Sequence, residues 1–459
     1  MSPKDQIETE PLRLAVCEQA GCPRKGWHDC VIGDHIRFHT DGLESYCFAA
    51  SQPLGYDLML VAAAVEVCDK SRRRPRHGWR RSFSIDIPVH DPVQWRDPAV
   101  ADRLRDALEL LTGDEWDLHF RSRSTPVPAP AAPMLPLPMQ VAAVMPYSDG
   151  LDSRAVATLL ERSLDGQLIR VRLGPVNDSD PTTRRQFAKV PYSVKPIGKA
   201  AESSGRSRAF KFTALAGIAA RLSGASRIVM SESMQGALGP ALVPVAHAYE
   251  DYRNHPLFTD RMAAFLCVLF GQSFHFDYPR LWSTKAETLI AAIAADATAA
   301  LKLTGTRSCW QDSRQVAFDG RRRQCGICAA CLLRRMSLHA AGLEDPPGTY
   351  IWEDLSAPTF AAAVLTGFNP KKVTRAQRAY AIAGALHMDH LAELHRTPAN
   401  VEEITHAAYR LARPPRLSET EIALKITDGL ERHRAEWKAF LAAVGPESFL
   451  HAWTKGDQP

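Results

Sequence analysis

Short apolar runs alternate with longer amphipathic segments through the middle of the chain, from Met139 to about Asp345. The first run, Val141 to Met145, ends at a polar turn, and a segment of good helix formers continues to Leu160. Apolar runs of this length predict strands, and apolar residues three and four apart predict helices. Repeated strand–helix units favour an α/β fold with a mostly parallel, doubly wound sheet that binds ligands at the carboxyl ends of its strands.

The other elements of this middle region, residues 139–345, follow the same alternation. We expect strands at Leu168 to Leu173, Lys189 to Val194 and Arg227 to Met230, and a helix at Ala209 to Leu222.

The regions on either side have different patterns. Residues 1–122 predict an α+β domain that is suited to docking a partner, with strands at Leu12 to Val16, His35 to His39 and Ser82 to Ile87 and helices at Tyr56 to Asp69 and Ala99 to Leu111. Residues 123–138 are proline-rich and predict an extended linker, because proline fixes φ and removes a hydrogen-bond donor. Residues 346–459 predict a helical region, with helices at Phe360 to Leu365, Ala376 to Leu394, Val401 to Leu411 and Ser418 to Val444.

The composition is that of an ordinary globular protein of two or three domains. Of the 459 residues, 45% are hydrophobic and 23% are charged, and the net charge of +5 is too small to argue for nucleic-acid binding. The basic stretch from Lys70 to Arg81 is interpreted as a solvated loop, with contact to an acidic partner or nucleic acid as the alternative. No apolar run approaches the roughly 18 residues of a membrane span, and no signal peptide is evident, so we expect a cytoplasmic protein.

The polar turn after the first strand is the first candidate site. It reads Ser148-Asp149-Gly150-Leu151-Asp152-Ser153 and opens a predicted helix. The N-terminus of a helix presents unpaired N–H groups and a positive dipole end, which favour bound phosphate. The alternative is an ordinary strand-to-helix turn capped by Asp152 or Ser153.

Four cysteines form the second candidate site. Cys325, Cys328 and Cys331 follow a C-x2-C-x2-C spacing, and Cys309 lies upstream. Four thiolates complete a tetrahedral Zn²⁺ site with no position left for water, which predicts a structural zinc; an iron–sulfur cluster is the alternative. Cys17, Cys22, His28 and Cys30 have irregular spacing and are interpreted as buried thiols, although the question of metal at these four positions stays open.

Both motifs together resemble one family. The turn is similar to the S-G-G-x-D-S loop of the PP-loop ATP pyrophosphatases, with Asp149 in place of the first glycine. The loop followed by an upstream Cys and C-G-x-C-x-x-C resembles the 7-cyano-7-deazaguanine synthases of that superfamily. Three further stretches agree with this family, namely Leu281 to Thr288, Gly205 to Phe210 with Arg208 as the counterpart of its arginine, and Tyr249 to Arg253.

The resemblance implies that the chain activates a carboxylate with ATP. Residues 148–153 would bind ATP, with Ser148, Gly150, Asp152 and Ser153 on the β- and γ-phosphates, and Mg²⁺ would bridge these phosphates. Asp152, Lys285 and Arg208 would be the catalytic residues, with Lys285 neutralising phosphate charge. The substrate would be 7-carboxy-7-deazaguanine or a similar acid, converted to an acyl-adenylate and then to an amide or nitrile. Asp149 would repel phosphate, point outward or help to hold Mg²⁺.

The chain also resembles enlarged relatives of the synthase that occur in anti-phage defence operons. That resemblance implies an amine acceptor on a protein partner encoded in the same operon, docked by the flanking regions. We expect neither a membrane partner nor direct contact with nucleic acid, and self-association is left open. A catalytically inactive nucleotide-binding scaffold and a PP-loop tRNA-modifying enzyme are the alternatives.

Overall fold

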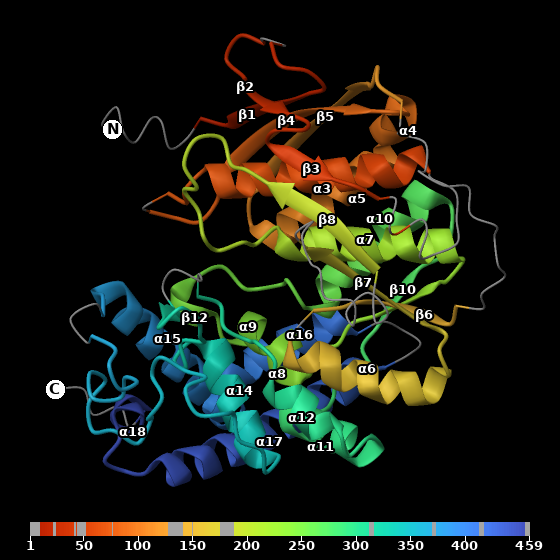
Figure 1. The fold of residues 1–459 in the computed structure, drawn as a ribbon. Coiled ribbons are helices and arrows are strands. Elements are labelled where there is room, and N and C mark those ends of the chain that lie inside the picture. Colours follow the sequence, from red (N-terminus) through yellow and green to blue (C-terminus); the bar gives the residue numbers. More distant parts are fainter. Residues whose placement is uncertain are drawn as a thin grey trace. The chain divides into compact units, whose positions relative to one another are not determined.

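The computed structural model describes residues 10–21, 24–40, 43, 52–75, 77–126, 141–148, 150–174, 188–311, 316–369, 373–412 and 417–454. The chain forms two compact units (Figure 1). The first unit comprises residues 1–147, 164–230 and 251–277, and the second comprises residues 148–163, 231–250 and 278–459. The four predicted domain ranges stay predictions.

The first unit contains a four-stranded parallel sheet in the order β2-β1-β4-β5. Its strands are β1 (Leu12–Cys17), β2 (His28–Val31), β4 (Ser82–Val89) and β5 (Glu115–Ser122). The helices of this part are α3 (Pro53–Ser71), α4 (Pro92–Arg96) and α5 (Pro98–Thr112). The strands predicted at the positions of β1 and β4 and the helices predicted at the positions of α3 and α5 are confirmed.

A six-stranded sheet completes the first unit, in the order β10-β9-β6-β7-β8-β3. It contains β6 (Ala143–Pro146), β7 (Leu168–Gly174), β8 (Ala188–Val194), β9 (Arg227–Val229) and β10 (His275–Asp277), all parallel, and the antiparallel edge strand β3 (Ile36–Phe38). Helices α7 (Arg208–Ser223) and α10 (Pro256–Phe270) connect its strands. The predicted mostly parallel α/β fold is confirmed, including its strands and α7.

Helix α3 packs between the two sheets of this unit (Figure 1). It contacts β1 and β4 of one sheet, β3 and β8 of the other, and α7. Every position from Leu58 to Asp69 is buried. A helix that is mostly apolar and buried on all faces is stable only when it is enclosed on all sides, which explains its place between the two sheets.

The strand order reverses between β6 and β9. Strands β7 and β8 follow on one side of β6, whereas β10 lies beyond β9. In open α/β sheets the carboxyl ends of strands at such a reversal lead into ligand-binding loops. Here β6 continues into the turn that begins at Ser148, and β9 continues towards Ser231.

The second unit is mostly helical and contains two short strands. It contains residues 151–163 of α6 (Leu151–Leu164), and α8 (Met234–Ala237), α9 (Gly239–Leu242), α11 (Lys285–Ala295), α12 (Ala299–Thr304), α14 (Ala329–Ala340), α15 (Arg375–Glu393), α16 (Val401–Leu411), α17 (Glu419–Val444) and α18 (Phe449–Thr454), with β11 (Ala317–Phe318) paired to β12 (Arg321–Arg322). The predicted helices at the positions of α15, α16 and α17 are confirmed. Ser418 and Glu421 form a capping box at the start of α17.

The helix predicted at Phe360 to Leu365 is wrong. These residues form turns, and Val364 makes an isolated antiparallel bridge with Trp352. The rings of Phe360 and Trp352 stack with centroids 4.9 Å apart, and the Trp352 indole N–H donates to the Phe360 carbonyl oxygen. Tertiary packing therefore decides the backbone of this segment.

Among the described helices, none has the combined length and apolar character that crossing a bilayer requires.

Candidate functional site

Three serine hydroxyl groups organise the turn at the start of α6. Ser148 Oγ accepts a hydrogen bond from the Gly150 N–H at 3.1 Å and lies 3.0 Å from Ser153 Oγ. Ser153 Oγ in turn lies 3.4 Å from the hydroxyl of Ser231, which follows β9. A Cβ at Gly150 would lie 2.9 Å from Ser148 Oγ, so glycine suits this close approach. The hydroxyl groups and the N-terminus of α6 provide donors that suit a phosphate group.

Asp152 and Lys285, which lie 133 positions apart in the sequence, form an ion pair. Lys285 Nζ donates to Asp152 Oδ2, and both side chains are largely buried. Asp152 Oδ1 is also buried, and within the described residues it has no hydrogen-bond partner. An unsatisfied buried carboxylate oxygen is costly unless a ligand or cation binds it, so this oxygen suits Mg²⁺.

Packing between helices brings the pair together. Leu151 and Ala155 of α6 share a buried apolar cluster with Leu289 and Ala292 of α11. Lys285 is the first residue of α11, directly after the N-cap Thr284. The position of the ammonium group therefore depends on the N-terminus of α11 as well as on α6.

Helix α17 supports this N-terminus of α11. Glu436 accepts hydrogen bonds from Thr284 Oγ1 at 2.5 Å and from Gln235 Nε2 at 3.3 Å. The Gln235 side-chain oxygen accepts from the Lys285 N–H at 2.8 Å. Burial, together with the nearby Glu287 carboxylate, raises the pKa of Glu436 to about 7. Sequence reasoning missed Glu436 and Gln235, because no local motif marks residues so distant from Lys285.

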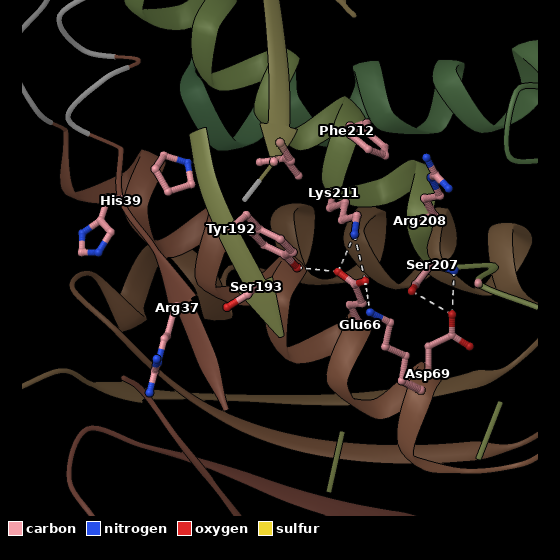
Figure 2. A pocket seen from close by; sticks show the side chains of 15 residues that line it. Arg37, His39, Glu66, Asp69, Tyr192, Ser193, Ser207, Arg208, Lys211 and Phe212 are labelled. Atoms are coloured by element: carbon pink, nitrogen blue, oxygen red, sulfur yellow. Dashed lines mark hydrogen bonds and ion pairs between the residues drawn. The ribbon is translucent and has the colours of Figure 1, made fainter. Parts of the chain in front are cut away.

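Arg208, the third predicted catalytic residue, belongs to the first unit, whereas Asp152 and Lys285 belong to the second. It is the first residue of α7, and its guanidinium lies 5.4 Å from the ring centroid of Phe212. It also lines a cavity of the first unit (Figure 2). Its catalytic role stays a prediction.

The neighbouring Arg206, rather than Arg208, forms an ion pair with a second of the family-like stretches. Its guanidinium lies 3.2 Å from Asp251, which also pairs with Arg253 at 2.5 Å. Burial opposes ionisation of Asp251, but the two guanidinium groups outweigh it and lower the pKa of this carboxyl well below its usual range. The ion pair joins two stretches that resemble the family, Gly205 to Phe210 and Tyr249 to Arg253. The Gly205-Arg206 pair was the sequence signal that could have identified Arg206.

The four predicted zinc ligands come together. The Sγ atoms of Cys309, Cys325, Cys328 and Cys331 all lie within 4.8 Å of one another. The Cys325 N–H donates to Cys309 Sγ at 3.2 Å, and the Cys328 N–H donates to Cys325 Sγ at 3.3 Å. Four soft sulfur donors with backbone N–H support fit Zn²⁺ in a closed, structural site, and they also fit an iron–sulfur cluster.

Two glycines permit the tight packing around this cluster. Gly326, between the first two cysteines of the turn, has φ +88°, and a Cβ there would lie 2.6 Å from the Trp352 carbonyl oxygen. A Cβ at Gly384 of α15 would lie 2.8 Å from the Ala329 nitrogen. Helix α15 therefore packs directly on the cysteine turn.

Some predictions fall partly outside the described residues. Asp149 and Cys22 are among these positions, as are residues 127–138 of the predicted linker. In the described part of the chain, Cys17, His28 and Cys30 do not gather into a metal-ligand group. Burial and the nearby Cys17 raise the pKa of the Cys30 thiol to about 12, in agreement with its interpretation as a buried thiol.

The comparison with protein families matches part of this chain. The family model described as Queuosine biosynthesis protein QueC matches residues 208–342. This range is under a third of the chain and includes Arg208, Lys285 and the four clustered cysteines. The match supports a QueC-like assignment of this segment to the PP-loop superfamily, whose members use ATP. A comparison with curated proteins gave no match.

Proposed function

We propose that the chain is an ATP-dependent, AMP-forming C–N ligase that activates a carboxylate as an acyl-adenylate. The observation that carries the proposal is the buried Asp152–Lys285 pair at the start of α6, with one Asp152 oxygen unsatisfied. The QueC match around Lys285 and the cysteines supports it. The hydroxyl groups of Ser148 and Ser153 and the N–H groups at the start of α6 suit the β- and γ-phosphates of ATP.

In this mechanism Lys285 exchanges its partner. Phosphate oxygens of ATP replace Asp152 on the ammonium group. Asp152 would hold Mg²⁺, which would neutralise charge on the phosphates. A carboxylate oxygen of the substrate attacks the α-phosphorus, the bond from this phosphorus to the bridging oxygen breaks, and pyrophosphate leaves. An amine then attacks the acyl carbon, and AMP leaves with the bonding electrons of the C–O bond while the amine loses a proton. Such chemistry depends on positioning and charge stabilisation rather than on a protein nucleophile.

The proposed acid is 7-carboxy-7-deazaguanine or a similar acid, by analogy with the family that matches residues 208–342. With ammonia the product is an amide or, after a second activation, a nitrile. We extend the proposal to an amine on a partner protein, in an anti-phage defence system, because most of the chain lies outside the matched range.

The test is ATP–pyrophosphate exchange with the full chain, Mg²⁺ and 7-carboxy-7-deazaguanine. Exchange that depends on the acid is expected, because adenylation is reversible before the amine arrives. ATP binding without exchange would contradict the proposal and favour the nucleotide-binding scaffold. Exchange with a tRNA substrate in place of the acid would favour the tRNA-modifying alternative.

A second experiment identifies the acceptor. The full chain, ATP and the acid are incubated with ammonium or with candidate partner proteins, and the small-molecule products and intact protein masses are measured. A mass gain on a partner that equals the acid minus water supports the protein acceptor. Amide or nitrile formation with no added mass on any partner would assign ammonia instead.

A further inference from the structure

The first unit contains an open cavity of about 870 Å³. It lies beside the start of α7 and the last turns of α3, and β3 and β8 form another part of its wall (Figure 2). Its volume falls in the range of roughly 300–1,000 Å³ that is typical of small-molecule sites. Helix α3 and strand β3 lie outside the range matched by the family model, so much of this wall belongs to the additional N-terminal region.

One buried carboxylate in the cavity wall forms ion pairs with two ammonium groups. Glu66 accepts from Lys70 Nζ at 2.7 Å, from Lys211 Nζ at 2.7 Å and from the Tyr192 hydroxyl at 2.6 Å. Figure 2 shows Lys211 and Tyr192 converging on Glu66. Because one negative charge faces two positive charges, this cluster retains a net positive charge beside the cavity.

The second carboxylate of the wall is also neutralised. Asp69 pairs with the buried Arg81 at 2.7 Å and accepts from both the N–H and the hydroxyl of Ser207, at 2.9 and 2.8 Å. Within the described residues, Arg208 has no carboxylate at ion-pair distance. The cavity therefore presents cationic groups that its own carboxylates leave uncompensated.

The start of α7 adds to this positive character. Ser207 is the N-cap residue of this 16-residue helix, but its side chain makes no cap hydrogen bond, since its hydroxyl donates to Asp69. The positive end of the helix dipole thus lies next to Arg208 and Lys211. Phe212, Tyr192 and Leu173 line the same cavity and provide apolar surface for a ring.

We propose that this cavity binds a phosphate-bearing ligand of nucleotide size, through residues of the first unit alone. Lys70, Lys211 and Arg208 contact the phosphate, and the aromatic side chains contact the ring. Lysine and arginine are the side chains that bind phosphate most strongly, which favours phosphate over a neutral ligand. The site is separate in composition from the turn at Ser148, which belongs to the second unit.

Binding of inorganic pyrophosphate to the full chain tests the proposal, measured by equilibrium dialysis. Arg208→Gln and Lys70→Gln remove cavity charges, and Arg221→Gln at the far end of α7 is the matched control. Lys285→Met weakens the proposed ATP site of the second unit. Thermal unfolding of each variant verifies that it is folded, and Lys70 is a safe position because its side chain is 38% exposed.

Pyrophosphate should bind to two classes of sites, the cavity and the proposed ATP site. We expect Arg208→Gln and Lys70→Gln each to weaken binding to the cavity class about tenfold, the effect of losing one charged hydrogen bond. Arg221→Gln and Lys285→Met leave this class unchanged. AMP displaces pyrophosphate from it at lower concentration than inorganic phosphate does, because AMP adds ring contacts.

Two results would overturn the proposal. One is equal pyrophosphate binding by the cavity variants and the Arg221→Gln control, and the other is loss of all binding in folded Lys285→Met. Displacement by AMP no better than by inorganic phosphate would overturn the assignment of a nucleotide-sized ligand. Failure of the proposed ligase activity would be distinguishable. The unaltered chain would then show no ATP–pyrophosphate exchange but would still bind pyrophosphate in the cavity.

Discussion

Lys285 has a backbone fixed by Gln235 and a side chain paired with Asp152. The backbone contact fixes where the side chain begins, and the ion pair keeps its buried charge neutral until an anion replaces Asp152. The residue is thus suited to stabilising charge on the phosphates of a bound ATP, which is where the proposed transition state needs it.

We predict that Lys285→Met and Asp152→Asn each lower acid-dependent ATP–pyrophosphate exchange by at least about a hundredfold, the usual cost of losing one preorganised group for charge stabilisation. Lys302→Met is the matched control, because Lys302 and Asp296 form an exposed ion pair at 3.3 Å in the same unit. Exchange assays on all three variants decide the matter. Unchanged exchange in Lys285→Met would remove Lys285 from the catalytic residues.

Glu436 makes the stability of the protein depend on pH in a definite direction. Its pKa is raised to about 7 in the folded chain, from the ordinary value of 4.5. An acid with a raised folded pKa stabilises the fold fully below pH 4.5, and this contribution is lost as pH rises through 7.

We predict that Glu436→Gln removes this loss, since glutamine stays neutral and its oxygen can still accept from Thr284 Oγ1. The free energy of unfolding of the unaltered chain should fall relative to the variant between pH 4.5 and 7, by about 1–3 kcal/mol. Denaturant unfolding at several pH values measures the difference. A pH-independent difference would show that Glu436 is ionised in the folded chain.

At the scale of elements, α15 fits the cysteine turn only because position 384 lacks a side chain. A Cβ there would contact backbone atoms at Ala329, Ile327 and Cys328, the nearest at 2.8 Å. Backbone atoms of a tight turn cannot move without displacing the cysteines. The contact joins α15 to the cluster of thiols that the sequence identified by spacing.

We predict that Gly384→Ala destabilises the protein by about 1–3 kcal/mol through overpacking, although alanine favours helix over glycine by about 1 kcal/mol. Gly429→Ala in α17 is the matched control, because its new Cβ would meet only the flexible side chain of Met234. Thermal unfolding should show a lowered midpoint for the first variant alone. Equal effects would indicate that α15 moves away from the turn without cost.

At the scale of the whole molecule, four clustered thiols lie in or against the apolar core of the second unit. Cys325, Cys328 and Cys331 are members of a buried apolar cluster that also contains Trp352 and Trp437. Four thiols in such a core are compatible with stability when a metal binds their deprotonated forms, so metal binding and folding should be coupled.

We predict one zinc per chain and loss of folded second unit in Cys328→Ser or after treatment with a strong chelator. Metal analysis, the visible absorption spectrum and limited proteolysis provide the measurements, and Cys267→Ala, outside the cluster, is the control. Iron with a visible absorption band would assign an iron–sulfur cluster instead. A folded, metal-free chain would refute the coupling.

The sequence alone determined those features that arise from neighbouring residues. The period of apolar positions was sufficient for α5, α16 and α17, because an amphipathic helix places residues three and four apart on one face. The cysteine spacing was sufficient to predict a metal-ligand group, because ligands on one turn and one upstream segment are nearly adjacent in the chain.

Only the tertiary structure decided what distant segments do together. It brought Glu436 to the hydroxyl of Thr284, the residue before Lys285, and it stacked Phe360 on Trp352 in place of the predicted helix. It also brought α3, β8 and α7 together around a basic cavity. Such contacts depend on how the apolar surfaces of distant elements pack together. They also depend on which charged side chains this packing buries and must therefore pair. Neither depends on local periodicity, so no pattern along the chain could have predicted them.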